Sequence, residues 1–341
     1  MELKSRRVEV DDALEAIELF FERRWSDGLP IVPPTPDKVE EMIRYAGRDP
    51  REELGSVPPR YGVATIEKLA INSVMAGCLP QYFPVVIAAV EAMLEPRFNL
   101  NGIQTTTHCN EPLLIVNGPI VKELGINAGD SVFGGGFRAN ATIGRASKLI
   151  LWNLGQSYPS ETDKSTFSHP GRFSFCIAEN EEASPWEPLH VERGLPPGSS
   201  AVTVFACEAP HSILSSGPAE TVLRTVWHSM ATLGNNNIDL GGETLVLISA
   251  RNAAQFEREG WSKQRVKQYI WEKARLPRAL VASAGLFPGR LKTEEIALTK
   301  GPEDIHVVVA GGFGQFCACC PGWGDLGGFA ITKEIKVPAP K

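Results

Sequence analysis

Three cysteines within four residues are the most distinctive chemical feature of this sequence. Cys317, Cys319 and Cys320 stand in a glycine-rich segment, residues 311–323, directly after an apolar run that predicts a buried strand. In α/β proteins the loops beyond the carboxyl ends of strands bind ligands, and glycine lets the backbone approach a ligand closely. Thiolates are soft ligands that select zinc, copper(I) or iron–sulfur clusters. The cluster therefore predicts a soft transition-metal cofactor (Cu, Zn or Fe–S), with a redox dithiol and inert buried thiols as open alternatives.

A second group of candidates lies before another apolar run. His108 and Cys109 are adjacent, and Cys78 lies at a junction between two expected helices. These three residues could complete a metal site with the C-terminal cysteines. Alternatively, Cys109 or Cys317 is a nucleophile and His108 is its base. If the C-terminal cluster is functional, we expect one of its thiols to lie within bonding reach of this second group.

Three consecutive glycines suggest a binding loop for the substrate. Gly134, Gly135 and Gly136 precede an expected helix that carries Arg138 and Arg145. A helix N-terminus with nearby cations favours a carboxylate or phosphate. The loop lacks the lysine and hydroxyl residue of a P-loop, and its spacing is not G-x-G-x-x-G, so nucleotides are not favoured. The alternative is a tight turn with surface arginines.

Hydrophobic periodicity predicts the elements that must position these residues. Helices are expected at residues 11–25, 36–46, 64–77, 84–95, 138–154 and 263–272. A further helix is expected after the turn at residues 215–218, and it carries Val222, Leu223, Val226, Trp227 and Met230. Strands are expected at residues 113–116, 202–206, 244–248 and 307–310. Because strands, glycine loops and helices alternate, the fold class is α/β, with two related α/β units behind a helical N-terminal region. We place that helical region at 1–100, the first unit with its connector at 101–200, and the second unit at 201–341.

Composition limits the partners of the chain. The 341 residues include 34 Lys and Arg against 40 Asp and Glu, which gives a net charge of −6 without a basic run that would bind nucleic acid. The longest apolar stretch, residues 84–94, contains Glu91 and is too short to cross a bilayer. An odd number of cysteines, seven, and a polar N-terminus indicate reduced thiols and a cytoplasmic protein. We expect neither nucleic acid nor membrane as a partner, and self-association into a homo-oligomer stays open.

Several long runs resemble a bacterial family known as UGSC-like proteins, which is named for its association with a selenocysteine-containing module. The runs are residues 25–36, 71–84, 113–155 and 173–188. The resemblance implies an enzyme-like, redox-linked role. Cys78 and His108 match the family pattern. Cys109 stands where the family usually has proline, and the three C-terminal cysteines replace serine and apolar residues, which implies a specialised chemistry.

These observations predict a cytosolic enzyme whose site lies between residues 105–111, 133–138 and 311–323. The favoured activity is oxidoreductase-like chemistry at a thiolate-ligated metal, acting on a small anionic molecule held by Arg138 and the glycine loop. One alternative is a metal-free lyase or hydrolase with a cysteine nucleophile. Another is a non-catalytic metal-binding or carrier protein.

Overall fold

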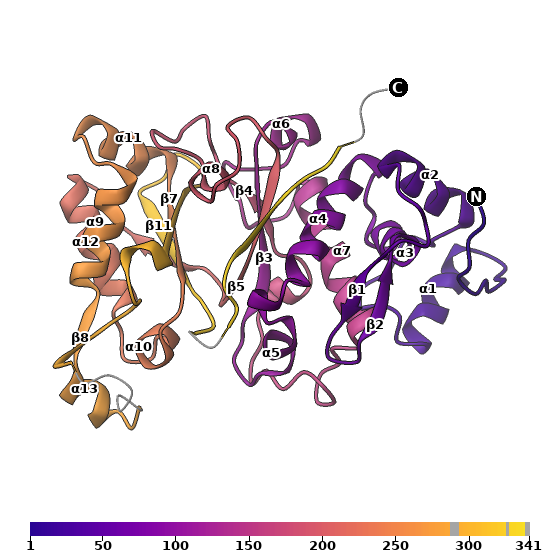
Figure 1. Ribbon diagram of the computed structural model, residues 1–341, viewed down its shortest axis with the longest axis horizontal. Coiled ribbons are helices and arrows are strands. Elements are labelled where there is room, and N and C mark those ends of the chain that lie inside the picture. Colours follow the sequence, from indigo (N-terminus) through magenta and orange to yellow (C-terminus); the bar gives the residue numbers. More distant parts are fainter. Residues whose placement is uncertain (287–292, 325–326, 338–341) are drawn as a thin grey trace.

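The computed structural model describes residues 1–286, 293–324 and 327–337, and its core consists of two four-stranded sheets packed face to face (Figure 1). The first sheet has the order β12-β5-β3-β4 and the second has the order β10-β7-β11-β6. The first sheet consists of β12 (Ile331–Glu334), β5 (Ala201–Cys207), β3 (Glu111–Asn117) and β4 (Cys176–Ala178). The second consists of β10 (Ile305–Val309), β7 (Thr244–Ile248), β11 (Phe316–Pro321) and β6 (His211–Leu214).

The two sheets repeat one pattern of strand directions. In the first sheet β3 pairs with β4 in parallel and with β5 in antiparallel fashion, and β12 is antiparallel to β5. In the second sheet β7 pairs with β10 in parallel and with β11 in antiparallel fashion, and β6 is antiparallel to β11. Each parallel pair is joined by a connection that contains helices, as parallel pairing requires. The α/β fold class expected from the sequence is confirmed.

Alternation along the strands gives each sheet two apolar faces. Leu113 and Ile115 of β3 face the other sheet, whereas Leu114 and Val116 face the helices. Phe205 lies in the layer between the sheets together with residues of all the central strands. Both faces are therefore buried, which explains why these strands read as continuous apolar runs.

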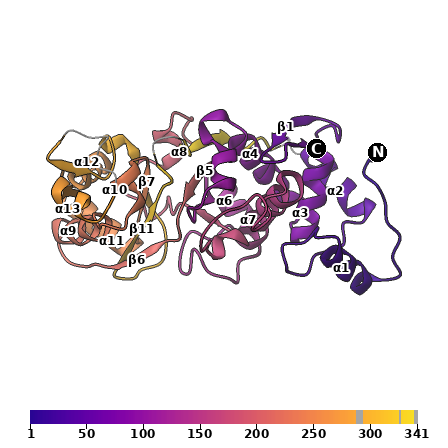
Figure 2. The ribbon, with the colours of Figure 1, turned by 90° about the horizontal axis from the view of Figure 1, so that it is seen from below.

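Helices cover the outer face of each sheet, so that the layers run helix, sheet, sheet, helix (Figures 1 and 2). On the first sheet they are α3 (Ile66–Ala76), α4 (Phe83–Met93) and α7 (Arg138–Ile150), with α1 (Ala13–Glu22) and α2 (Pro36–Ala46) farther out. On the second sheet they are α9 (Ala219–Met230), α11 (Ala250–Arg258) and α12 (Lys263–Lys273). α4 is buried at every position except Glu91, as its apolar sequence predicts.

Short elements complete the described parts of the chain. The helices among them are α5 (Leu100–Thr105), α6 (Ile120–Leu124), α8 (Leu189–Glu192), α10 (Asn236–Leu240) and α13 (Arg278–Ser283). The strands are the pair β1 (Glu53–Val57) and β2 (Gly62–Thr65) and the pair β8 (Arg275–Pro277) and β9 (Glu295–Ala297). Residues 1–200 and residues 201–341 do not form separate sheets, because β5 pairs along its whole length with β3. The expected division into residues 1–100, 101–200 and 201–341 therefore stays a prediction, with its last boundary crossing a sheet.

Local sequence signals set the helix ends. Thr65 accepts a hydrogen bond from the Lys68 N–H at the start of α3, and Gly77 ends that helix with φ +89°. Gly47 ends α2 with φ +66°, a left-handed conformation that glycine adopts without steric cost. Pro36 occupies the first turn of α2, where its missing N–H is not needed.

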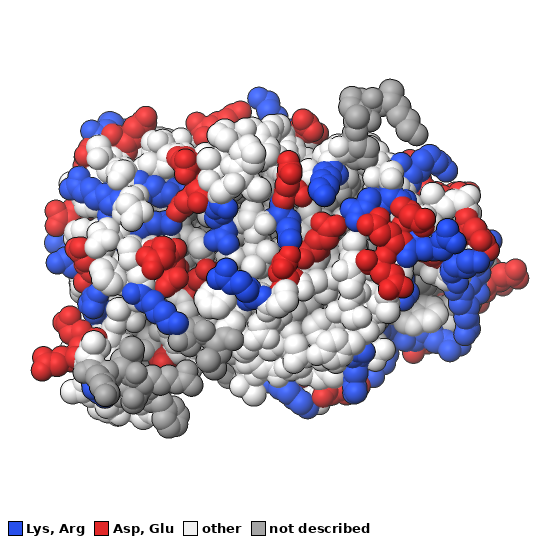
Figure 3. Space-filling view, in the orientation of Figure 1, with Lys and Arg blue, Asp and Glu red and all other residues white. Residues whose placement is uncertain are grey.

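Charged side chains of both signs are interspersed over the face in Figure 3. Among the described residues, none of the helices has the length and apolar character that crossing a membrane requires.

We predict that the layer between the sheets dominates stability. Phe205 is 1% exposed in this layer, so Phe205→Ala should lower the free energy of unfolding by about 3–5 kcal/mol, through lost burial and a residual cavity. Phe313→Ala is the matched control, because Phe313 is 72% exposed and its loss should change stability by less than about 0.5 kcal/mol. Urea unfolding followed by circular dichroism measures both. Equal effects of the two substitutions would contradict the inter-sheet core.

Candidate functional site

The three C-terminal cysteines lie in a central strand and not in a loop. β11 occupies Phe316–Pro321 within the predicted loop 311–323, and pairs with both β7 and β6. Successive side chains of a strand point to opposite faces. Cys317 and Cys319 therefore pack against the helices of the second sheet, whereas Cys320 packs between the sheets. The strand geometry separates the three thiols, so they do not form one ligand set.

The surroundings of these thiols keep them protonated. Burial raises the pKa of Cys317 to about 11 and that of Cys319 to about 12. The pKa of Cys320 is raised mainly by a hydrogen bond with Cys207 and also by burial. The hydrogen bond from Asn252 Nδ2, which lies 3.4 Å from Cys317 Sγ, lowers the pKa of Cys317 but is outweighed by burial. In the described parts of the chain, no group of three or more His, Cys, Asp or Glu side chains is arranged to hold a metal ion.

His108 forms a dyad with a carboxylate that the sequence did not single out. Its Nε2 lies 2.7 Å from Glu208 Oε1, and its Nδ1 lies 3.2 Å from Asn110 Nδ2. The amide nitrogen of Asn110 can only donate, so Nδ1 accepts and Nε2–H donates to Glu208. Both ring nitrogens are thus engaged, and neither is available as a base for Cys109. Burial and the Glu208 carboxylate raise the pKa of Cys109, which also disfavours a thiolate nucleophile.

The segments around His108 and Cys320 nevertheless lie close together. The Glu208 N–H donates to Pro321 O at 2.9 Å, next to Cys320. Trp323 Nε1–H donates to Thr106 Oγ1 at 3.3 Å. The segments around His108 and Cys320 thus approach each other as expected. The contacts are made by Glu208 and Trp323, and they do not bring several thiols together at one site.

Cys78 lies in a different core. It is buried between the helices and the first sheet, where its thiol donates to Thr142 O at 3.2 Å. Burial raises its pKa to about 12. Because Cys317 and Cys319 belong to the core of the second sheet, Cys78 does not join them.

The two arginines after the glycine loop have intramolecular partners. Arg138 donates to Gly77 O from Nη2 at 2.9 Å, at the C-terminal end of α3. Arg145 binds the Asp27 carboxylate with Nε at 3.0 Å and Nη2 at 2.8 Å. Gly134, Gly135 and Gly136 themselves are exposed. The structure therefore gives Arg145 a structural role and does not direct it toward the glycine loop.

A small cavity does form between the glycine-loop segment and the region before β11. It has a volume of about 300 Å³, and its walls include Asp130, Phe133, Gly312 and Cys317. Its charged wall residue is Asp130, and the Cys317 thiol is neutral there. The lining of this cavity includes Phe133 and residues of the segment 311–323 but none of residues 105–111, so it matches the expected site only in part and has few groups that could transfer protons.

A larger cavity of about 530 Å³ has a buried cluster of charged side chains in its wall. Lys148 of α7 is 5% exposed, and its Nζ lies 3.2 Å from Glu111 Oε2 and 2.9 Å from Pro112 O. Arg172 pairs with Glu111 and, from Nη1 at 3.0 Å, with Asp163 Oδ2. Lys148, Glu111 and Arg172 line the cavity, and Asp163, which is not part of the lining, pairs with Arg172. We call these four residues the buried ion cluster.

The buried ion cluster has the electrostatics of a reactive site. Burial lowers the pKa of Lys148 to about 8 in spite of the nearby Glu111 carboxylate. Burial also lowers the pKa of His169, which lines the same cavity. The Gly171 N–H donates to His169 Nδ1 at 3.1 Å, so the neutral ring carries its proton on Nε2. An amine and an imidazole whose pKa values are both lowered by burial therefore share one cavity.

The backbone around this cavity is unusual. α7 continues as a π-helix over Leu151–Gly155, and such turns occur often at functional sites. Gln156 and Ser168 have φ values of +52° and +55°, which residues other than glycine rarely adopt. Gln104 lines the cavity with a buried Oε1 that has no hydrogen-bond partner in the described structure. A buried acceptor of this kind is satisfied when a ligand supplies a donor.

Comparison with known proteins does not assign this chain to a family. The chain matches no protein-family model and no curated protein. The site and the fold therefore carry the functional argument.

We predict that Cys109 reacts first with an alkylating agent. It is half-buried, whereas the other six cysteines are buried, so iodoacetamide should label one thiol in the native protein and seven after unfolding. Peptide mapping by mass spectrometry identifies the labelled residue. Cys109→Ala should abolish the native labelling. Rapid native labelling at Cys317, Cys319 or Cys320 would instead support an accessible thiol site in β11.

Proposed function

We propose that this protein is a metal-free enzyme of the lyase class in which Lys148 is the reactive amine. The observation that carries the proposal is a buried lysine, ion-paired to Glu111, in the wall of a cavity of about 530 Å³. A lysine whose pKa is lowered by burial is a nucleophile for carbonyl groups or a base near neutral pH. This proposal keeps the lyase alternative of the sequence analysis and replaces the cysteine nucleophile with an amine.

The surrounding groups support imine chemistry at Lys148. With a pKa of about 8, roughly a tenth of the amine is neutral at pH 7 and can attack a carbonyl carbon. Glu111 lies 3.2 Å from Nζ and can accept the proton that the amine loses on attack. Dehydration then forms the C=N bond and releases water, because the protonated Glu111 can return that proton to the leaving hydroxyl group. His169 lies in the same wall, where its Nε2–H donates to Cys207 O at 3.4 Å.

The charge of the cavity favours a neutral, hydroxylated carbonyl compound. Its carboxylates, Asp27 and Glu111, are balanced by Arg145, Lys148 and Arg172, and Asp163 compensates the third cation. No cation is in excess for an anionic substrate among these residues. The unpaired Gln104 Oε1 accepts a hydrogen bond from a hydroxyl group.

The thiolate-metal hypothesis receives no such support. The alternation of β11 and the high pKa values of its thiols oppose a shared metal centre at Cys317, Cys319 and Cys320. The redox-linked role implied by the UGSC-like resemblance stays a separate proposal. Metal analysis of the purified protein distinguishes it from the amine proposal.

Borohydride trapping tests the proposed imine. We expect dihydroxyacetone with borohydride to add one reduced adduct to the chain, which peptide mapping places on Lys148. Borohydride transfers hydride to the imine carbon and leaves a stable secondary amine. Pyruvate, as an anionic carbonyl compound, should react at least tenfold more slowly. Faster trapping of pyruvate would overturn the neutral substrate class, and absence of a Lys148 adduct with both compounds would overturn the amine proposal.

Two variants separate specific from surface reaction. Lys148→Met should remove the adduct, because methionine fills a similar volume without an amine. Lys122→Met is the control, because Lys122 is 88% exposed and pairs loosely with Glu182 at 3.4 Å. Circular dichroism of both variants checks that they fold.

The rate of trapping should depend on pH in a defined direction. The neutral amine reacts, so the rate at Lys148 should rise through a midpoint near pH 8. An ordinary exposed lysine has a pKa of about 10.4, so adducts at exposed lysines should increase only at higher pH. Initial rates between pH 6 and pH 10 provide the measurement. A midpoint for Lys148 equal to that of exposed lysines would contradict the lowered pKa.

A further inference from the structure

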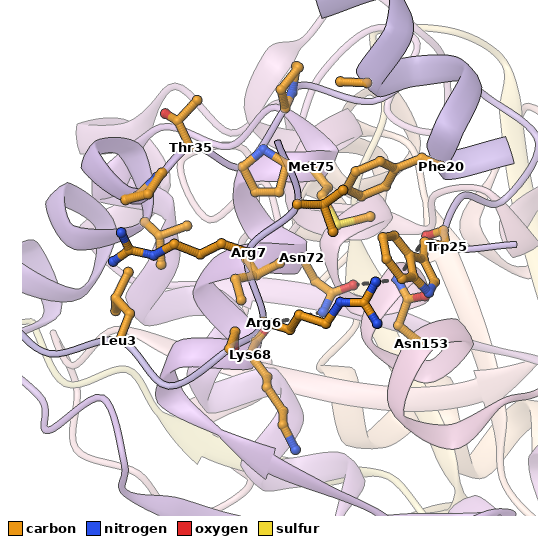
Figure 4. Close-up of a pocket in the computed structure, with 18 of the residues that line it drawn as sticks. Leu3, Arg6, Arg7, Phe20, Trp25, Thr35, Lys68, Asn72, Met75 and Asn153 are labelled. Atoms are coloured by element: carbon orange, nitrogen blue, oxygen red, sulfur yellow. Dashed lines mark hydrogen bonds between the residues drawn. The ribbon is translucent and has the colours of Figure 1, made fainter. Parts of the chain in front are cut away.

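A third cavity, of about 730 Å³, lies between the N-terminal segment and the outer helices of the first sheet (Figure 4). The segment around Leu3–Val10 passes over α3 and closes one side. Its backbone is fixed there, because the N–H groups of Lys4 and Ser5 donate to the Glu67 carboxylate at 3.0 and 2.7 Å. Burial alone would raise the pKa of Glu67, but these N–H groups outweigh it and lower the pKa. The anchored segment makes this wall part of the fold.

The inside of the cavity is apolar and partly aromatic. Phe20 and Trp25 form an edge-to-face pair with ring centroids 5.3 Å apart. Ala16, Val39, Ile71 and Met75 are among the other apolar residues of the lining. The polar amides in the wall are already paired, because Asn153 Nδ2 donates to Asn72 Oδ1 at 2.8 Å and to Trp25 O at 3.0 Å. The interior therefore fits a hydrocarbon or aromatic group and offers few polar contacts.

Cationic side chains stand at the edge of this apolar space. Figure 4 shows the Arg6 side chain extending toward Trp25 and Asn153, whereas Arg7 extends the other way. Among the described residues, the Arg6 guanidinium has neither an ion pair nor a hydrogen bond. Lys68 also lines the cavity, but its Nζ donates to Val63 O at 2.9 Å. The carboxylates of the lining are Glu67, which the N-terminal segment occupies, and the exposed Glu9. An unpaired cation beside an apolar cavity complements a molecule with an apolar body and one anionic group.

We propose that this cavity binds a small amphipathic carboxylate, with its apolar part against Phe20 and Trp25 and its carboxylate on Arg6. The volume falls within the range of about 300–1,000 Å³ that is usual for sites of small ligands. A guanidinium binds a carboxylate through two parallel hydrogen bonds, which an alcohol of the same length cannot form. The site is separate from the buried ion cluster and does not depend on the chemistry proposed for Lys148.

Decanoate, used below its micelle concentration, is the probe, and decanol is its uncharged counterpart. We expect the full chain to bind decanoate about tenfold more tightly than decanol in calorimetric titration, since a charge-assisted bidentate contact exceeds a neutral one. Arg6→Gln should weaken the binding of decanoate about tenfold and leave that of decanol unchanged. Arg6 is exposed, so this substitution should not impair folding.

Controls locate the bound molecule and separate the two proposals. Arg224→Gln removes an exposed cation from α9 and should leave the affinity for decanoate unchanged. Lys148→Met should also bind decanoate normally, even if the lyase proposal fails. The indole N–H signal of Trp25, identified by its loss in Trp25→Phe, should move on titration because Trp25 lines the cavity. Equal affinity for decanoate and decanol, an unchanged affinity in Arg6→Gln, or a stationary Trp25 signal would each overturn the proposal.

Discussion

Two sheets that each carry helices on one face must bury their other faces against each other. The side chains that do so include Leu113 and Phe205 from the first sheet and Leu247 and Cys320 from the second. This contact fixes β11 as a central strand, because both of its faces are covered. The contact between the sheets therefore also separates the three cysteines, because a Cys-x-Cys-Cys sequence in an extended strand places its thiols on opposite faces.

The buried ion cluster lies where the inter-sheet core meets the helices. Glu111 begins β3 opposite Cys207, and Lys148 reaches it from α7. Charges in such a place are costly unless they are paired, and replacing them by apolar side chains often costs no stability. Stability alone therefore does not explain why ionisable side chains occupy positions 148, 111 and 172. A reactive role explains why a lysine with a lowered pKa borders a cavity and is not sealed in the core.

Periodicity could predict much of the fold because the strands and helices bury nearly continuous faces. The sequence correctly predicts β3, β5, β7 and β10, the helices α1 to α4, α7, α9 and α12, and the end of α2 at Gly47, but it misses α11. It does not predict β11, because the surrounding glycines and cysteines resemble a loop and the pairing with β7 is long-range. The proposed site depends equally on distant contacts: Lys148 and Glu111 are 37 positions apart. A charged residue within the apolar face of an expected helix, such as Lys148, is the signal that could have revealed it.

The end of α7 connects the two cavities physically. In the π-helix Leu151–Gly155, Leu151 and Trp152 line the cavity of the buried ion cluster, whereas the next two residues line the N-terminal cavity. The same turn holds the segment between them, because Trp152 Nε1 donates to Arg24 O at 2.8 Å and Asn153 donates to Trp25 O. Two residues beyond Trp25, Asp27 lines the ion-cluster cavity and is clamped by Arg145. A shift of this turn would move a wall of both cavities. The backbone conformation of the π-helix therefore fixes the position of lining residues in both.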